Sequence, residues 1–150
     1  MTTKRFKIII DGKSVVVQNG QTILDVAKKN KIDIPALCYH PDLKARANCR
    51  ICVVEIKGVR GLKTACSTEV SPGMKIITNS PKVKRARKIN LELIFAQHEE
   101  ECSDCIWNFN CHLAKLADEY KVKTTRFAER KSKRPVYQFG PSLIFDTRKC

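Results

Sequence analysis

Hydrophobic and polar residues alternate with a period of two near the start of the chain. The β-branched runs FKIII and SVVVQ flank Asp11-Gly12, a favoured pair for a two-residue type I′ turn, and therefore predict a β-hairpin. The period then becomes helical in NGQTILDVAKKNK. Because Thr22 and Asp25 have the spacing of a capping box ahead of an apolar face, this segment predicts a short helix.

Strand-like segments return after a long loop. Apolar runs separated by glycine and proline predict strands over residues 51–56, 62–65 and 74–78. A hairpin, a helix, a loop and further strands make a small α+β domain, which we place at residues 1–79.

From Pro81 onward the pattern is helical. Apolar residues recur every three or four positions, with basic residues between them, at Val83, Ala86, Ile89, Leu93 and Ala96. In a second helical segment, one apolar face consists of Leu113, Leu116, Ala117 and Tyr120. We therefore expect a small helical domain at residues 80–120. Residues 121–150 are charged and weakly patterned, and we expect a linker there.

Composition narrows the class of protein. The chain has 150 residues, of which 43% are apolar, enough for a folded core. The apolar runs are too short for a membrane span or a signal peptide, so we expect a cytoplasmic protein without direct membrane insertion. In that reducing compartment an even number of cysteines does not imply disulfides. Eight cysteines exceed what a small core uses as apolar filler, which predicts metal binding.

The net charge of +14 raises nucleic acid as a partner. The basic residues concentrate at 82–88 and 121–134, on either side of a stretch with the acidic residues Glu99, Glu100, Glu101 and Asp104. Part of this excess can compensate the negative charge of thiolate-bound metal centres. The excess of basic residues is explained equally well by two solvent-exposed faces, one on a helix and one in a linker.

The first candidate metal-binding set has the spacing C-x10-C-x2-C-x13-C and consists of Cys38, Cys49, Cys52 and Cys66. A zinc ribbon usually has two close cysteine pairs, and here only one pair is close. Plant-type [2Fe-2S] ferredoxins instead combine a loop of three cysteines with one remote cysteine, although they place four residues where this chain has ten. Small Ala47 and flexible Asn48 would allow backbone amides to approach the sulfurs.

The second candidate set has the spacing H-x3-C-x2-C-x5-C and consists of His98, Cys102, Cys105 and Cys111. At the end of a helix, the i and i+4 spacing places His98 and Cys102 on one face. One imidazole and three thiolates suit tetrahedral zinc or one [4Fe-4S] cluster, and the spacing leaves both open.

Both sets occur within a longer resemblance. Together with IPALCYHPDL, NCRICVVEI, ACSTEVSPGMKIITNSPKV and LELIFAQHEEECSDC, they resemble the N-terminal part of [FeFe]-hydrogenase large subunits and the large iron-sulfur subunit of NADH-quinone oxidoreductase (complex I). The resemblance covers residues 5 to about 120. It implies a β-grasp, plant-type [2Fe-2S] ferredoxin domain at 1–79, followed by a small helical [4Fe-4S] domain at 80–120. The implied ligands are Cys38, Cys49, Cys52 and Cys66 for the first cluster, and His98, Cys102, Cys105 and Cys111 for the second.

This resemblance implies an iron-sulfur electron-transfer module. We find no acid, base or nucleophile constellation, so we expect a one-electron relay without a catalytic site of its own. The implied partners are other subunits of an NAD(P)H-linked oxidoreductase: a flavoprotein that oxidises NAD(P)H, and a hydrogenase or quinone-reducing module. The sequence pattern of residues 100–120 favours a hydrogenase over a complex I type assembly. A cytoplasmic location is expected, with peripheral attachment to a membrane complex left open.

Several residues near these sets need separate interpretation. In the same families the pattern D-x-x-K-C, here residues 146–150, opens a further domain with two [4Fe-4S] clusters, whose other cysteines are missing. We therefore expect the linker at 121–150 to end where that domain would start, with Cys150 a free thiol. We assign His40 and His112 structural or solvent-facing roles. Trp107 and Phe109 are expected to shield the second cluster from water.

Two other functions compete with electron transfer. A zinc-stabilised nucleic-acid-binding protein would explain the charge and the two four-ligand sets, but the basic segments lack interleaved aromatic residues and neither set has finger spacing. We therefore expect no nucleic acid partner. A redox sensor that signals by losing its cluster is the other alternative, and the sequence leaves it open.

Overall fold

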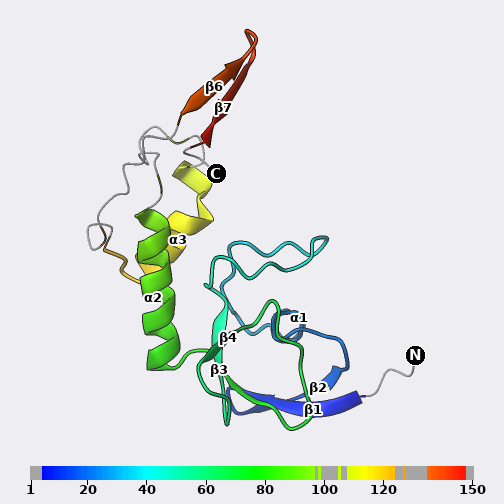
Figure 1. Cartoon of the computed structure of the whole chain (residues 1–150). Coiled ribbons are helices and arrows are strands. Elements are labelled where there is room, and N and C mark those ends of the chain that lie inside the picture. The colour runs from blue at the N-terminus through cyan, green and yellow to red at the C-terminus, as the bar shows by residue number, and fades with distance from the viewer. Residues whose placement is uncertain are drawn as a thin grey trace.

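The computed structural model of the chain describes residues 5–96, 98, 105, 108–123, 127 and 135–147. Figure 1 shows strands β1 to β4 and helix α1 at one end of the molecule, helices α2 and α3 beside them, and a separate hairpin at the other end. Among the residues that the structure describes, no helix has the length and apolar character needed to cross a membrane.

The predicted N-terminal hairpin is confirmed. Strands β1 (Arg5–Ile10) and β2 (Lys13–Gln18) pair antiparallel. Asp11 and Gly12 between them have positive φ angles of 48° and 82°, as a type I′ turn requires. The alternation of the two strands points one face of the hairpin into the core.

The three further strands are also confirmed, each slightly shorter than predicted. They are β3 (Val53–Ile56), β4 (Leu62–Thr64) and β5 (Lys75–Ile77). The sheet has the order β2-β1-β5-β3-β4, in which β5 runs parallel to β1 and antiparallel to β3. The result is a mixed sheet, consistent with a [2Fe-2S] ferredoxin-like domain. Its last pair, β3 and β4, leads directly to two of the cysteines.

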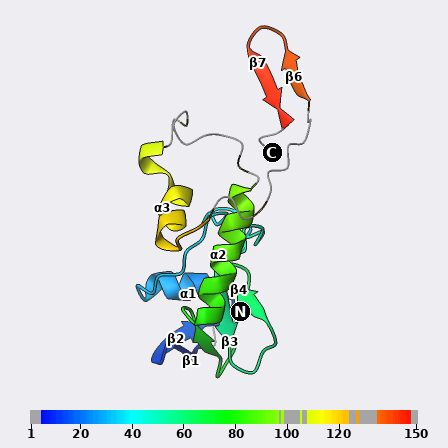
Figure 2. The same cartoon turned by 90° about the vertical axis from the view of Figure 1, so that its left-hand side faces the viewer.

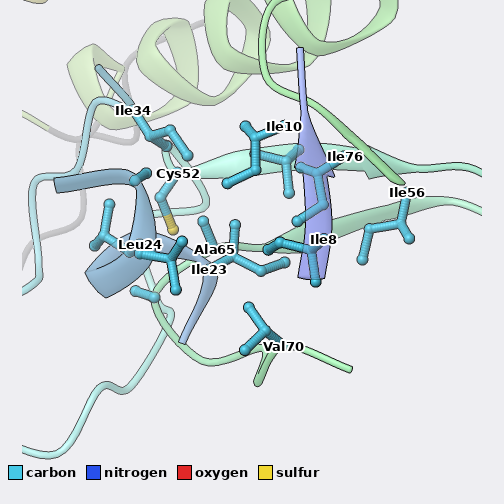
Figure 3. Close-up of a cluster of buried hydrophobic side chains, with 14 of the residues drawn as sticks. Ile8, Ile10, Ile23, Leu24, Ile34, Cys52, Ile56, Ala65, Val70 and Ile76 are labelled. Atoms are coloured by element: carbon cyan, nitrogen blue, oxygen red, sulfur yellow. The ribbon is translucent and has the colours of Figure 1, made fainter. Parts of the chain in front are cut away.

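Helix α1 (Ile23–Lys29) begins with the predicted capping box. Thr22 Oγ1 accepts a hydrogen bond from the Asp25 N–H at 3.2 Å, and Asp25 Oδ2 accepts one from the Thr22 N–H at 3.1 Å. The apolar face of α1 covers the sheet and completes the main core. Figure 3 shows this core, in which the Cys52 side chain lies among the labelled aliphatic residues.

Helix α2 (Pro81–Phe95) begins at its N-cap Ser80, with Pro81 in the first turn. The helix is confirmed, but the predicted buried face is partly wrong. Leu93 is 44% exposed, while Arg87, which the pattern placed among the solvated basic residues, is only 2% exposed. The reason is that α2 packs on two partners, β3 and α3, which together cover its surface over Val83, Arg87, Leu91 and Glu92.

A second core joins α2 to helix α3 (His112–Glu119), which comes after the short 3-10 helix η1 (Asn108–Asn110). Its buried centre is formed by Ile51, Leu91 and Leu116, with Leu113 and Tyr120 packed against it. The predicted apolar face of this helix is thus confirmed. Ile51 brings the loop of the first domain into the same core.

The C-terminal segment contains a hairpin that the sequence analysis missed. Strands β6 (Val136–Phe139) and β7 (Leu143–Asp146) pair antiparallel around Gly140, whose φ angle is 67°. Figures 1 and 2 both show the hairpin extending away from the sheet. Its large apolar side chains are exposed. The segment expected to be a linker thus contains two short strands that the sequence analysis did not predict.

Candidate metal centres

The structure places the four cysteines of the first set around the end of the β3–β4 pair. Cys38 and Cys49 come from the loop between α1 and β3, Cys52 immediately precedes β3, and Cys66 comes just after β4. Cys38 is exposed and Cys49 is half-buried, whereas Cys52 and Cys66 are each 1% exposed. The described cysteines are all free thiols. The set therefore reaches from the core to the surface.

Cys52 and Cys66 are held together by the sheet. Their strands are in register, with Val53 opposite Thr64, and the Ala65 N–H donates to the Cys52 carbonyl at 2.9 Å. Burial raises the pKa of the Cys66 thiol to about 12, and a hydrogen bond with the Cys52 side chain adds to this rise. Electrostatic interaction with Cys52, Cys38 and Cys49 favours the protonated Cys66 in the same direction.

Cys38 and Cys49 form a second pair. Burial opposes the thiolate of Cys49, but hydrogen bonds from the backbone of Ile51, Cys38 and Leu37 and from the Cys38 side chain outweigh it. The pKa of Cys49 is consequently lower than its ordinary value. Backbone N–H groups directed at a sulfur stabilise negative charge on it, which is what a thiolate ligand needs.

Two residues with left-handed backbone lie on either side of Cys49 in the loop. Ala47 and Arg50 have positive φ angles of 53° and 55°, a left-handed conformation that costs a non-glycine residue about 1–2 kcal/mol. The left-handed Arg50 directly precedes Ile51, whose backbone N–H is one of those directed at the Cys49 sulfur. The small Ala47 predicted a close approach of backbone and sulfur. The two left-handed residues themselves had no signal in the sequence.

The donor set fits a [2Fe-2S] cluster. A binuclear cluster needs two thiolates on each of two irons, and the hydrogen bonds pair Cys49 with Cys38 and Cys66 with Cys52. Within the part of the chain that the structure describes, no three His, Cys, Asp or Glu side chains form a group suited to a metal ion. The fit of this set to a [2Fe-2S] cluster rests on its four thiols and on the interactions that pair them.

The second set is described only in part, because Cys102 lies outside the described residues. His98 comes after α2 and is exposed; its N–H donates to the Phe95 carbonyl at 3.0 Å, and its ring stacks on Phe95 with the centroids 6.1 Å apart. Cys111 is the N-cap of α3, and its Sγ accepts a hydrogen bond from the Ala114 N–H at 3.4 Å. Cys105 is half-buried. A sulfur at a helix N-terminus is well placed to act as a thiolate.

The packing of α2 and α3 brings His98 and Cys111 to the same end of the helix pair. Arg87 in the second turn of α2 bonds Tyr120 just after α3, whereas Leu91 and Leu116 meet in the second core. The helices are therefore antiparallel, so the end of α2 lies at the start of α3. An imidazole and thiolates at that end fit the donor set of a [4Fe-4S] cluster.

The two sites share the second core. Leu37 and Cys49 from the first site and Leu113 next to Cys111 all pack against it, around the buried Ile51. Sequence reasoning assigned Ile51 only to a strand and did not detect this role. The sequence feature that could have indicated this role is the position of Ile51 between Cys49 and Cys52. That position places Ile51 at the first site, from which its side chain enters the second core.

The neighbouring residues are partly as expected. His40 is exposed and lies 3.7 Å from Asp42, and His112 is also exposed. Phe109 is 100% exposed on η1, and its expected role in shielding the second cluster stays a prediction. Trp107 and Cys150 lie outside the described residues.

Two family profiles match the chain. The profile described as "2Fe-2S iron-sulfur cluster binding domain" matches residues 3–81, and the one described as "NADH-ubiquinone oxidoreductase-G iron-sulfur binding region" matches residues 87–126. These regions contain the first and the second set, respectively. They show one [2Fe-2S] and one [4Fe-4S] cluster as cofactors, and the zinc alternative is not favoured.

Known proteins are similar over nearly the whole chain. The "NADP-reducing hydrogenase subunit HndD" of Solidesulfovibrio fructosivorans is 38% identical over 95% of this chain and 25% of its own. A G-type subunit of the NADH-quinone oxidoreductase of Rhizobium meliloti is 34% identical over 96% of this chain and 17% of its own. The chain thus spans a quarter or less of these two relatives.

A solved structure shares the fold. A chain of the "NAD+-reducing [NiFe]-hydrogenase in the H2-reduced state" superposes with a TM-score of 0.83 and 29% identity, covering 97% of this chain and 61% of that chain. Iron-sulfur clusters in such a scaffold exchange single electrons, so the chain is an electron-transfer module. With a matching profile over residues 3–81 and four cysteines gathered within it, the chain belongs to the family of 2Fe-2S iron-sulfur cluster binding domains.

Proposed function

We propose that this chain is the iron-sulfur relay of a multi-subunit NAD(P)-linked oxidoreductase. The observation that carries the proposal is the second core, which contacts Cys49 on one side and, through Leu113, lies next to Cys111 on the other. A relay needs two centres joined by packed protein. The similarity to subunits of hydrogenases and of NADH-quinone oxidoreductase supports the same role.

The first centre is assigned to the β-grasp domain at residues 1–79. Cys38, Cys49, Cys52 and Cys66 would hold the cluster, and the structure brings Cys49 into interaction with Cys38 and Cys66 into interaction with Cys52. Bound there, a [2Fe-2S] cluster supplies reversible uptake of one electron. The N–H groups around Cys49 stabilise its charge, while the buried Cys52 and Cys66 exclude water from the core side.

The second centre is assigned to the helical region at residues 80–120. Its ligands are His98, Cys102, Cys105 and Cys111. The exposure of His98 and the half-burial of Cys105 and Cys111 leave this centre near the surface. Residues 121–150 then connect this centre to the next part of a longer assembly.

The exposure of the ligands indicates on which side of the first centre a partner approaches. Cys38 is the exposed member of the first set, so it marks the side where a partner approaches the first centre. Cys49 and Ile51 face the second core and hence the second centre. We propose a flavoprotein that oxidises NAD(P)H at one end, and a hydrogenase or quinone-reducing module at the other. The relation to [FeFe]-hydrogenase large subunits belongs to the same proposal.

The test is the metal content and EPR spectrum of anaerobically prepared protein. We expect about six irons per chain and separate signals from a [2Fe-2S] and a [4Fe-4S] centre. Cys49→Ser should remove the first signal and keep the second, and Cys111→Ser should do the reverse. Two zincs in a colourless protein, or loss of both signals in each folded variant, would contradict the assignment.

A further inference from the structure

Arg87 is a buried cation without a role in the sites described above. It is 2% exposed, although Lys84 and Arg85 on the same helix are exposed and Lys88 is half-buried. A guanidinium does not lose its proton at any pH that proteins tolerate, so the charge stays in the protein interior. Such burial costs several kcal/mol unless the charge has suitable partners.

The partners of Arg87 join three parts of the chain. Its Nη2 donates to the Val53 carbonyl at 2.9 Å, and its Nη1 donates to the Tyr120 hydroxyl at 3.0 Å. Both acceptors are uncharged. Among the residues that the structure describes, Arg87 Nε is the one buried side-chain nitrogen or oxygen without a hydrogen-bond partner. Arg87 therefore has two neutral acceptors and one N–H without a partner, and within the described residues it forms no ion pair with Glu92, the other buried charged side chain of α2.

The position of Val53 connects this charge to the first centre. Val53 is the residue after Cys52 and opens β3, so Arg87 reaches the backbone one residue beyond a buried thiol. Because Arg87 is buried, its charge is screened less by solvent and acts over a longer range than it would at the surface. In the described ranges of the chain, Arg87 is the one buried cation.

We propose that the fixed positive charge of Arg87 raises the reduction potential of the first centre. The inference rests on the proposed assignment of Cys52 as a ligand. Uptake of one electron makes the thiolate-ligated site more negative, and a fixed positive charge nearby stabilises that added electron. If Arg87 served packing alone, an apolar side chain of similar length would replace it without this electrostatic effect.

The test is an EPR-monitored redox titration of the intact chain with both clusters. Arg87→Gln removes the charge, Arg87→Lys keeps a positive charge, and Arg85→Gln removes an exposed charge of the same helix as a control. With the [4Fe-4S] signal as internal reference, Arg87→Gln should lower the reduced-to-oxidised ratio of the [2Fe-2S] centre about tenfold at fixed potential. For a one-electron couple this equals about 59 mV. Arg87→Lys should retain most of the original ratio, and Arg85→Gln all of it.

A second variant changes the electrostatic surroundings of Arg87 from a different residue. Tyr120→Glu leaves Arg87 in place and sets a carboxylate on the side of the guanidinium that the tyrosine hydroxyl occupies. It should also lower the potential of the first centre. Unchanged potentials in whichever of Arg87→Gln and Tyr120→Glu retain the centre would overturn the inference. Absence of a [2Fe-2S] signal in the unaltered chain would instead overturn the proposed function.

Discussion

Asp11 and Thr78 are 67 positions apart in the chain and meet at the turn of the first hairpin. The Asp11 carboxylate accepts hydrogen bonds from the Thr78 N–H at 2.8 Å and from the Thr78 hydroxyl at 2.6 Å. The turn thus anchors the end of β5, the strand that leads into α2. This contact connects the N-terminal hairpin to the point where the second region begins.

Asp11→Ala should destabilise the chain by about 2–4 kcal/mol. The substitution removes both acceptors, at about 1–3 kcal/mol for part-buried donors left unpaired, and places alanine at a φ angle of 48°. Urea unfolding of the intact chain measures the effect. Asp33→Ala, at an exposed position, is the control and should change stability by less than about 0.5 kcal/mol. Equal effects of the two variants would show that the contact does not support the fold.

Asp25 should contribute to the loss of stability in acid. Burial opposes its ionisation, but hydrogen bonds from the Thr22 hydroxyl and backbone and from the Tyr39 hydroxyl, with the charge of Lys28, lower its pKa below 3.8. The unfolded chain thus binds the proton more readily than the native chain does. The stabilisation is complete above the unfolded pKa and is lost as the pH falls through the lower folded pKa.

This dependence can be measured by unfolding free energies between neutral pH and about pH 3. Asp25→Asn should flatten the acid side of the profile and lower stability at neutral pH. Asp33→Asn should leave the profile unchanged, because its side chain is exposed. An acid limb of equal slope in the Asp25→Asn variant would contradict the assignment.

Leu91→Ala should cost about 2–5 kcal/mol of stability, because it opens a cavity in the second core. Leu93→Ala, two residues further along α2, is the matched control: this side chain is 44% exposed, and its truncation should cost less than about 1 kcal/mol. Thermal or urea unfolding distinguishes the two. Similar losses would mean that α2 packs with the face that the apolar pattern first predicted.

His98→Cys should keep a [4Fe-4S] centre and shift its reduction potential. A thiolate replaces a neutral imidazole, so the site becomes one charge more negative and the potential falls. An EPR-monitored redox titration provides the measurement. His112→Cys, at an exposed position on α3, should leave the potential unchanged. Retention of the original potential in His98→Cys would count against His98 as a ligand.

Local features were predictable because they depend on residues close in sequence. Asp11-Gly12 requires only the backbone freedom of a type I′ turn, and the Thr22–Asp25 box closes within three residues. The spacing of the eight candidate ligands likewise identified two sites before any packing was known. The hairpin around Gly140 had a comparable turn signal, but the charged, weakly patterned residues before it concealed two short strands.

The amino-acid sequence by itself determined which segments can form strands and helices, and which thiols and imidazole could bind metal. Tertiary structure decided how these parts meet. An apolar pattern indicates which side chains can be buried, but α2 has two partners, and only their placement exposes Leu93 and buries Arg87 between Val53 and Tyr120. The pairing of Cys38 with Cys49 and of Cys52 with Cys66 depends in the same way on the loop's left-handed residues and the register of β3 with β4. Such contacts join residues far apart in sequence, and their energy exists only when the chain is folded.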